Sequence, residues 1–380
     1  MKTKVLLVGV GGYGSGYVRA LTGRDYGAEI AGIVDVMPNI REVCPEVGKN
    51  NLKVYTSIAE FYKENTADLA ILSSPIHLHT QMSIECMKNG SHVLCEKPLC
   101  LTEEEVEQLE ACQKETGKWL AVGYQMNYRD DVLALKNDIL SGKFGAPRII
   151  SVAHAYRRGS KYYARNNWAG RVSVNGREVF DSPFTNACAH NFQMMTFLIG
   201  SDLSSACDIT GVEAELYRGN KNVENYDIAF MRFHTDAGAD ILYHTAHPLS
   251  TEVFGPYGKM EFEKGTVEFG PDQRFYAKLD SGETIDYGAP DTDAYDRKLI
   301  EAIKGAKTGV CPVCTTRSEL GHVRAVRFVQ ALPVKNVDES LVDVIEDAAR
   351  GTCCHVKELE RTLLACHENK RLPGEMGIAF

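Results

Sequence analysis

The chain lacks an excess of positive charge and a long apolar run, and we expect no leader peptide. Its 380 residues include 42 lysines and arginines against 51 aspartates and glutamates, with a net charge of −9 and the two signs mixed along the chain. Nucleic-acid-binding proteins gather positive charge into a patch, so this class is excluded. No apolar run approaches the ~20 residues that cross a bilayer, and Met1-Lys2-Thr3 runs directly into an apolar strand pattern. We therefore expect a soluble cytoplasmic protein with no nucleic-acid or membrane partner.

Disulfides and a structural metal are not expected either. The 12 cysteines are more than usual, but the thiols of a cytoplasmic chain stay reduced. Two stretches raise the question of zinc: Cys311-Pro312-Val313-Cys314 and Cys353-Cys354-His355. Because a single Cys-x-x-Cys without a second pair at zinc-finger spacing is a weak signal, we favour free thiols and predict no metal.

The first third of the chain alternates strand and helix. Its apolar runs are nearly continuous, as in parallel strands that are covered on both faces. They read Lys4–Val10, Glu29–Val34, Asp68–Ser74, Ser91–Cys95 and Trp119–Tyr124. The clearest helix between them spans 102–116, with Thr102 and Glu105 as a capping box and Gly117 at its end. Because crossovers are right-handed, the pattern predicts a doubly wound parallel Rossmann sheet.

Beyond these strands the pattern becomes that of an antiparallel sheet. A turn at 142–145 leads into a strand-like run, and more runs follow as far as Tyr287; the clearest are 148–156, 206–217, 226–235 and 239–247. One long helix interrupts them from about Pro183 to Leu198, capped by Asp181 or Ser182. Four further helices are predicted at 293–304, 316–331, 339–350 and 356–369.

These patterns predict an α/β protein in three parts. Residues 1–127 form the Rossmann domain. Residues 128–312 form an α/β domain with an open, mostly antiparallel sheet, and residues 313–380 are helices that pack back on the fold.

A dinucleotide site is indicated by the loop Gly9-Val10-Gly11-Gly12-Tyr13-Gly14, which follows a strand and opens a helix. Gly9 permits the tight turn, Gly11 lets the backbone approach a pyrophosphate, and Gly14 lets helix and strand pack closely. Asp35 ends the second strand, 21 residues after Gly14. A carboxylate there accepts both ribose hydroxyls of NAD and repels the 2′-phosphate of NADP. The combination predicts NAD, while nearby Arg41 leaves NADP open.

Three neighbouring strand ends supply further polar groups. One gives Ser74-Pro75 with His79, the next gives Glu96-Lys97 before a proline, and the last gives Tyr124-Gln125. Ligands of such sheets bind outside the carboxyl ends of the strands, so these groups are expected around one crevice with the glycine loop. Lys97 would then face the reacting end of the dinucleotide. The others are candidate contacts to the cofactor or, for Tyr124, to the substrate.

In this order the motifs resemble the glucose-fructose oxidoreductase, inositol dehydrogenase and MocA family of NAD(P)-dependent oxidoreductases. The match spans residues 1 to about 330 and rests on the glycine loop, Ser74-Pro75 with His79, Glu96-Lys97-Pro98, Gly142-Lys143-Phe144-Gly145 and a helix bearing His190. The resemblance implies a Rossmann domain and a substrate-binding α/β domain whose open sheet forms an oligomer interface, here of a homodimer or homotetramer. It also implies hydride transfer at a hydroxyl-bearing carbon of a sugar, inositol, glycoside or related polyol.

A second motif of the family places an aspartate or asparagine four residues before a histidine, which here reads Asn186-Ala187-Cys188-Ala189-His190. The family aspartate three residues after the histidine is Gln193 in this chain. Helical spacing puts Asn186, His190 and Gln193 on one stripe of an otherwise apolar helix. A lone histidine there would read as a satisfied core residue, but with Lys97 expected opposite we favour a catalytic site.

The expected chemistry is oxidation of a secondary alcohol. His190 takes the hydroxyl proton, since its ordinary pKa of about 6.5 lies near working pH. Lys97 hydrogen-bonds the same oxygen and stabilises the developing alkoxide. Asn186 orients the histidine or a substrate hydroxyl but brings no charge.

Further substrate contacts are predicted within 156–171. The run from Tyr162 to Trp168 mixes aromatic faces with amides and a guanidinium, which suits the apolar face and hydroxyl rim of a sugar. The candidates there are Tyr156, Tyr163, Asn167 and Trp168. A turn packed by its own aromatics, or an oligomer contact, explains the run equally well, so both interpretations stay open.

Two other functions are weighed against a dehydrogenase. An NAD-dependent glycosidase would oxidise a sugar carbon transiently to labilise a glycosidic bond, and would release cleaved glycoside without net NADH. A dinucleotide-binding regulatory protein would bind NAD without turnover. Because Lys97 and His190 are both present, we favour an enzyme that acts on CH–OH groups.

Overall fold

The computed structural model describes residues 1–291, 293–294 and 296–380, and the chain folds into two compact units. The first unit is Met1–Tyr128 together with a later segment that ends at Glu319. The second unit comprises Arg129–Asp291 and Leu320–Phe380. The first stretch of this unit therefore ends at Tyr128, one residue beyond the expected boundary at 127. The later segment of the unit was expected, as far as residue 312, to belong to the second domain.

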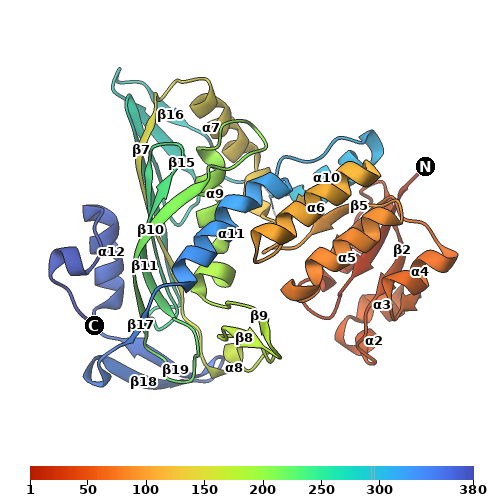
Figure 1. Cartoon of the computed structure of the whole chain (residues 1–380), viewed down its shortest axis with the longest axis horizontal. Helices are drawn as coiled ribbons and strands as arrows, with labels where there is room; N and C mark the ends of the chain where they lie inside the picture. The colour runs from red at the N-terminus through yellow and green to blue at the C-terminus, as the bar shows by residue number, and fades with distance from the viewer. Residues whose placement is uncertain (292, 295) are drawn as a thin grey trace. The chain divides into compact units, whose positions relative to one another are not determined.

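A six-stranded parallel sheet, in the order β3-β2-β1-β4-β5-β6, forms the centre of the first unit (Figure 1). Its strands are β1 (Thr3–Val8), β2 (Ala28–Val34), β3 (Val54–Tyr55), β4 (Leu69–Leu72), β5 (His92–Cys95) and β6 (Leu120–Val122). The order reverses between β1 and β4, the place where doubly wound sheets bind ligands. The predicted Rossmann sheet is confirmed.

Helices flank this sheet, and α5 and α6 lie side by side. The helices of the unit are α1 (Ser15–Gly23), α2 (Ile40–Val43), α3 (Pro45–Lys49), α4 (Ile58–Glu64), α5 (Ile76–Lys88), α6 (Glu103–Thr116), the short η1 (Gln125–Tyr128) and α10 (Arg297–Thr308). At α6 the Thr102 hydroxyl accepts from the Glu105 N–H at 3.2 Å, as predicted. The Glu105 carboxylate, however, accepts from the N–H of Leu101 instead of closing the capping box. Gly117 ends the helix in the left-handed conformation, at φ +66°.

The second unit contains a nine-stranded mixed sheet in the order β16-β15-β14-β13-β7-β12-β11-β10-β17. Only the pairs β7–β12 and β10–β17 are parallel among its described pairs, so the sheet is mostly antiparallel, as predicted. Its strands are β7 (Pro147–Tyr156), β10 (Ile209–Arg218), β11 (Ile228–Thr235), β12 (Asp240–Ala246), β13 (Val253–Phe262), β14 (Gly265–Phe269), β15 (Phe275–Leu279), β16 (Thr284–Asp286) and β17 (Val334–Asn336). A minor hairpin joins β8 (Ser173–Val174) to β9 (Arg177–Glu178).

Helices cover both faces of this sheet. Figure 1 shows α9 (Ala189–Leu198) against one face and α12 (Leu359–Asn369) against the other, where α12 packs on β7, β12 and β13. The remaining helices are α7 (Asp130–Leu140), α8 (Ser160–Tyr163), α11 (Thr316–Gln330), which runs from the first unit into the second, and the short η3 (Glu339–Leu341) and η4 (Gly374–Met376).

The chain's own end covers part of the sheet face on which an oligomer interface was expected. The ring of Phe380 stacks on Phe230 with centroids 5.8 Å apart, and both Arg232 guanidinium nitrogens donate to Glu375 at 2.8 Å. The expected homodimer or homotetramer stays a prediction, and through this face it would have to use the strands that α12 leaves uncovered.

The prediction of a helix at 339–350 is wrong. After η3, the chain forms the antiparallel hairpin β18 (Val342–Asp347) and β19 (Gly351–Val356). The β-branched Val342, Val344 and Ile345 favour a strand. The Asp347 carboxylate accepts from the N–H groups of the turn residues 349 and 350. Tight turn chemistry thus overrides a helix-like charge pattern.

Other predicted boundaries shift by a few residues. The helix expected from Asp293 begins at Arg297, with positions 292 and 295 outside the described residues, and the helix expected from Val356 begins at Leu359. No described helix combines the length and apolar character that crossing a membrane requires. Each of the 12 cysteines is a free thiol. Within the described part of the chain, no three His, Cys, Asp or Glu side chains gather as metal ligands would.

Candidate dinucleotide site and reaction residues

Close backbone approaches shape the glycine loop between β1 and α1. Gly9 has φ +78°, and a Cβ there would lie 2.8 Å from the carbonyl oxygen of Ser73. A Cβ on Gly14 would lie 2.0 Å from the carbonyl oxygen of Gly9. Both contacts forbid a side chain. The loop can pass this close to Ser73 only with glycine at position 9, and α1 can begin this close to the Gly9 carbonyl only with glycine at position 14.

A cavity of about 380 Å³ opens beside this loop, wholly within the first unit. Its lining includes Gly9, Gly11 and Gly12 of the loop, Asp35 after β2, and Ser74-Pro75 after β4. The volume suits one nucleoside rather than a whole dinucleotide. Combined with a loop that excludes a Cβ at positions 9 and 14, the cavity fits the nucleoside and phosphate end of NAD.

The Asp35 carboxylate organises the loop itself. Its Oδ2 accepts from the N–H groups of Val10 at 2.8 Å and Gly11 at 3.2 Å, and its Oδ1 accepts from Met37 N–H at 2.9 Å. These bonds fix the negative charge at the rim of the cavity. Asp35 thus lies where the NAD-selective carboxylate was predicted, and it also holds the loop that would meet the phosphates.

A buried ion pair ties the glycine loop to the strand ends. The Lys298 ammonium, from α10, donates to Glu96 Oε1 at 2.5 Å, to the Tyr13 hydroxyl at 3.2 Å and to the Gly123 carbonyl at 3.2 Å. The Tyr17 hydroxyl donates to the same Glu96 oxygen at 2.5 Å. The side chains of Lys298 and Glu96 are only 2% and 9% exposed. Four segments of the first unit are therefore joined around one pair of charges.

The electrostatics of this pair favour the charged state of the lysine. Burial by itself lowers the pKa of Lys298, but the Glu96 carboxylate and the Tyr13 hydroxyl more than offset burial, so that pKa lies above its ordinary value. Tyr13 also donates to Gln125 Oε1 at 3.0 Å, which brings the sixth strand end into the network. Glu96 is thereby held in this buried network by Lys298 and Tyr17.

His79 is a structural link rather than a lining residue of the cavity. It is 1% exposed, and its ring nitrogens lie 2.9 Å from the Pro98 carbonyl oxygen and 2.7 Å from the Ser74 carbonyl oxygen. Burial lowers the pKa of His79. The histidine therefore joins the ends of β4 and β5 instead of meeting the cofactor directly.

Lys97 and Tyr124 occupy different environments at the neighbouring strand ends. Lys97 is half-buried, directly after Glu96. Tyr124 is fully buried, and its hydroxyl donates to Glu319 Oε1 at 3.2 Å. A substrate therefore has no access to Tyr124 in this structure, which removes the residue from the substrate candidates.

The helix expected to carry Asn186 and His190 is broken in the second unit. A π-helical turn, η2 (Pro183–Ala187), precedes α9, and Cys188 separates the two with φ −111° and ψ 8°. Ser182, one of the two predicted caps, accepts from Thr185 N–H. Asn186 thus belongs to the turn and His190 to α9, so one regular stripe through both residues is not formed.

Asp181 supplies a carboxylate behind Asn186. The Asn186 amide donates to Asp181 Oδ1 at 2.7 Å, and Asp181 Oδ2 accepts from Gly170 N–H at 2.6 Å. Asp181 is 2% exposed. A buried carboxylate is thus bonded directly to the Asn186 amide, at the position where the family also carries an aspartate.

The other substrate candidates divide between packed and exposed positions. The Arg165 guanidinium lies over the Tyr162 ring at 3.6 Å and near the Trp168 ring at 5.1 Å, so this run packs on itself. Tyr163 bonds to His247, with 2.8 Å between its hydroxyl and Nδ1. Asn167 is exposed. Tyr156, also a candidate, contacts the His154 ring at 4.6 Å and is half-buried.

Two site residues escaped the sequence prediction. Lys298 is separated from Glu96 by 202 positions, and its only sign was a lysine beside the apolar face of α10 that carries Leu299 and Ile303. Asp181 was considered only as a helix cap. Lys97 belongs to the first unit and His190 to the second, so their meeting around a substrate stays a prediction.

Comparison with known proteins identifies the first unit. Residues 3–124 match the model of the "Oxidoreductase family, NAD-binding Rossmann fold". The match covers about a third of the chain and lies wholly within the first unit. That unit is therefore an NAD-binding Rossmann domain, in agreement with the cavity beside the glycine loop.

Curated relatives and solved structures extend the comparison. The chain is 25% identical to inositol 2-dehydrogenase 1 of Saccharopolyspora erythraea over 205 residues, 53% of this chain and 56% of the relative. It is 27% identical to inositol 2-dehydrogenase of Burkholderia cenocepacia over 208 residues, 54% of this chain and 57% of the relative. The chain thus spans a little over half the length of the curated relatives it matches.

Similarity of fold reaches further along the chain. The WlbA dehydrogenase of Bordetella pertussis, solved with NADH and UDP-GlcNAcA, aligns with a TM-score of 0.71 and 20% identity over 87% of this chain and 96% of that one. The aldose-aldose oxidoreductase of Caulobacter crescentus aligns with a TM-score of 0.70 and 17% identity over 87% of this chain and 97% of that one. At this identity the likeness establishes the fold of the chain.

Proposed function

We propose that this protein is an NAD-dependent dehydrogenase that oxidises a secondary hydroxyl of a sugar, inositol or glycoside. The observation that carries the proposal is the cavity beside the glycine loop, with Asp35 at its rim and Lys97 at a neighbouring strand end of a family-matched NAD-binding domain. The inositol and sugar dehydrogenases among the similar proteins support the substrate class.

The residues take the roles expected from their chemistry. Lys97 donates a hydrogen bond to the substrate oxygen and stabilises negative charge that develops on it. His190 accepts the hydroxyl proton, and Asn186, held by Asp181, positions the substrate or the histidine. Bound NAD would supply the hydride acceptor. The Glu96 carboxylate is paired with Lys298, so Lys298 balances its negative charge at this strand end.

The test is NADH formation by the full chain on a panel of inositols, aldoses and glycosides. The proposal expects turnover on at least one compound, with a loss of about 10²-fold or more for Lys97→Ala and for His190→Ala. Lys53→Ala, at an exposed lysine of the same unit, serves as the control. Unchanged turnover in Lys97→Ala would refute the role of that residue. Cleaved glycoside without NADH would instead identify the glycosidase.

A further inference from the structure

A second cavity, of about 970 Å³, lies wholly within the second unit and shares no residue with the cavity beside the glycine loop. It is bounded by α8, the turn 218–222 after β10, the stretch that follows β17, and the hairpin β18–β19. Figure 1 shows these elements at one end of the nine-stranded sheet, and α8 contacts β19. The hairpin that escaped sequence prediction is thus one of its walls.

One wall is fixed by the guanidinium of Arg218. Its nitrogens donate to the carbonyl oxygen of Asn225 at 3.1 Å, to that of Glu224 at 2.5 Å and to Asn336 Oδ1 at 3.1 Å. These three acceptors are neutral, and they use three of the five N–H groups that an arginine carries. The side chain is therefore held in place with donors left for a ligand.

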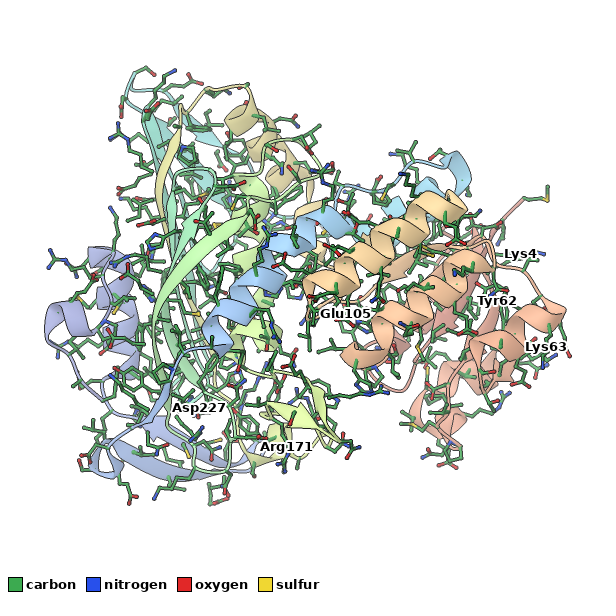
Figure 2. The ribbon with its side chains drawn as sticks, in the orientation of Figure 1. Lys4, Tyr62, Lys63, Glu105, Arg171 and Asp227 are labelled. Atoms are coloured by element: carbon green, nitrogen blue, oxygen red, sulfur yellow. The ribbon has the colours of Figure 1, made fainter. Side chains whose placement is uncertain are left out.

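A buried carboxylate fixes the adjoining turn. Asp227, labelled in Figure 2, is 1% exposed and accepts from the N–H groups of Gly219 at 2.7 Å and Asn220 at 2.9 Å. The Asn220 side chain in turn accepts from Asn222 N–H at 3.0 Å. Burial raises the pKa of Asp227 to about 6. Placing a carboxylate in this environment opposes stability, which is typical of groups that serve a site.

A tyrosine hydroxyl completes the fixed polar groups. Tyr163 lines the cavity, and its hydroxyl lies 2.8 Å from Nδ1 of His247, which is 2% exposed. Burial holds the pKa of His247 well below its ordinary value, so the imidazole is neutral. The bond to His247 therefore fixes the Tyr163 side chain where it lines the cavity.

The composition of the walls decides the chemistry of the ligand. The walls carry two positive charges, on Arg218 and Lys221. Lys221 pairs with Glu339 at 2.5 Å, and the buried carboxylate of Asp227 balances the charge of Arg218. The remaining groups are amides, hydroxyls and apolar surface, from Asn220, Asn222, Asn336, Ser160, Thr352, Val337, Val342 and Val344. Balanced charge with many hydrogen-bonding groups and some apolar surface suits a neutral, hydroxylated molecule rather than a phosphate or a lipid.

We propose that this cavity is a second small-molecule site, which binds a neutral saccharide of one or two sugar units. Because the walls are already fixed, ligand binding orders fewer side chains and therefore loses less conformational entropy. The site is separate from the NAD-binding domain, so the proposal does not depend on the proposed oxidoreductase activity.

Calorimetric titration of the full chain tests this proposal, with maltose and glucose as neutral probes and glucuronate and inorganic phosphate as anionic ones. Val344→Trp fills the mouth of the cavity, and Asn222→Ala removes one amide. Val310→Trp is the matched control, because Val310 and Val344 are 66% and 67% exposed. We expect a neutral probe to bind, Asn222→Ala to weaken binding about fivefold, and Val344→Trp to abolish it. Val310→Trp and Lys97→Ala should leave binding unchanged.

Three outcomes would overturn the proposal. They are no binding of either neutral probe, preference for the anionic probes, and binding that survives Val344→Trp. Loss of binding in Lys97→Ala would assign the sugar to the reaction site instead. A protein that binds a neutral probe here yet turns over no substrate would refute the proposed function and leave this site standing.

Discussion

Removing Lys298 should destabilise the first unit far more than an ordinary surface substitution. Lys298→Met keeps most of the side-chain volume but removes the ammonium from the Glu96 carboxylate, which is 9% exposed and keeps the hydrogen bond from the Tyr17 hydroxyl at 2.5 Å. Breaking a buried pair from one side costs about 3–5 kcal/mol, because the remaining charge is buried without compensation. The double variant Glu96→Gln with Lys298→Met removes both charges. It should therefore lose less than the sum of the single changes, with a coupling of about 2 kcal/mol.

The assay is urea unfolding of four proteins: the parent, the two single variants and the double variant. The pair Lys53–Glu64 provides a matched cycle in the same unit, since its atoms approach to 2.6 Å but its side chains are 62% and 61% exposed. An exposed pair contributes at most about 1 kcal/mol. A coupling at Glu96 and Lys298 no larger than that of the exposed pair would refute the buried network. Lys298→Met should also weaken NAD binding, because the lysine holds Tyr13 of the glycine loop.

The other predictions concern the loop, the cofactor and pH. Gly14→Ala should abolish NAD binding in a fluorescence titration, since its Cβ would meet the Gly9 carbonyl oxygen at 2.0 Å, whereas Gly12→Ala, with no atom within 4 Å of the added Cβ, should bind almost normally. NAD should bind more tightly than NADP, and Asp35→Asn should reduce the difference between the two dissociation constants. Tighter binding of NADP by the parent would contradict the role of Asp35. Burial lowers the pKa of His154 to about 4, so the stability it contributes is complete above its unfolded pKa of about 6.5 and falls as pH drops below that value. Chemical unfolding of the parent and of His154→Gln should show that His154 accounts for about 2 kcal/mol of the free energy of unfolding that the parent loses between neutral pH and pH ~5. An equal pH dependence of unfolding in both proteins would contradict this.

Local patterns in the sequence predicted the first unit well. The continuous apolar strands, the glycine loop and Asp35 each act over a few positions, and their geometry follows from sterics and strand order. The cap of α6 also came out as predicted at Thr102 and Gly117. Motif spacing therefore sufficed to place Lys97 at a strand end of a nucleotide-binding sheet.

Long-range contacts and competing local preferences explain what the sequence could not predict. Lys298 finds Glu96 across 202 positions, and no local pattern states such a partner. The apparent helix at 339–350 became the hairpin β18–β19, because β-branched residues and an aspartate turn outweighed its charges. Asn186 seemed to share a helix stripe with His190, but the π-helical turn before α9 breaks that helix. The spacing of the motif therefore located Asn186 and His190 in the sequence but did not predict the local backbone conformation.

Transfer of deuterium to NAD tests the central claim most directly. The full chain is incubated with NAD and the best substrate of the panel, which is deuterated at the carbon that bears the reacting hydroxyl. The mass of the NADH formed is then measured by mass spectrometry. Direct hydride transfer predicts NADH that carries the substrate's deuterium, with formation slowed strongly in Lys97→Ala. Unlabelled NADH, or no NADH from any compound of the panel, would contradict the assignment of this protein as a dehydrogenase.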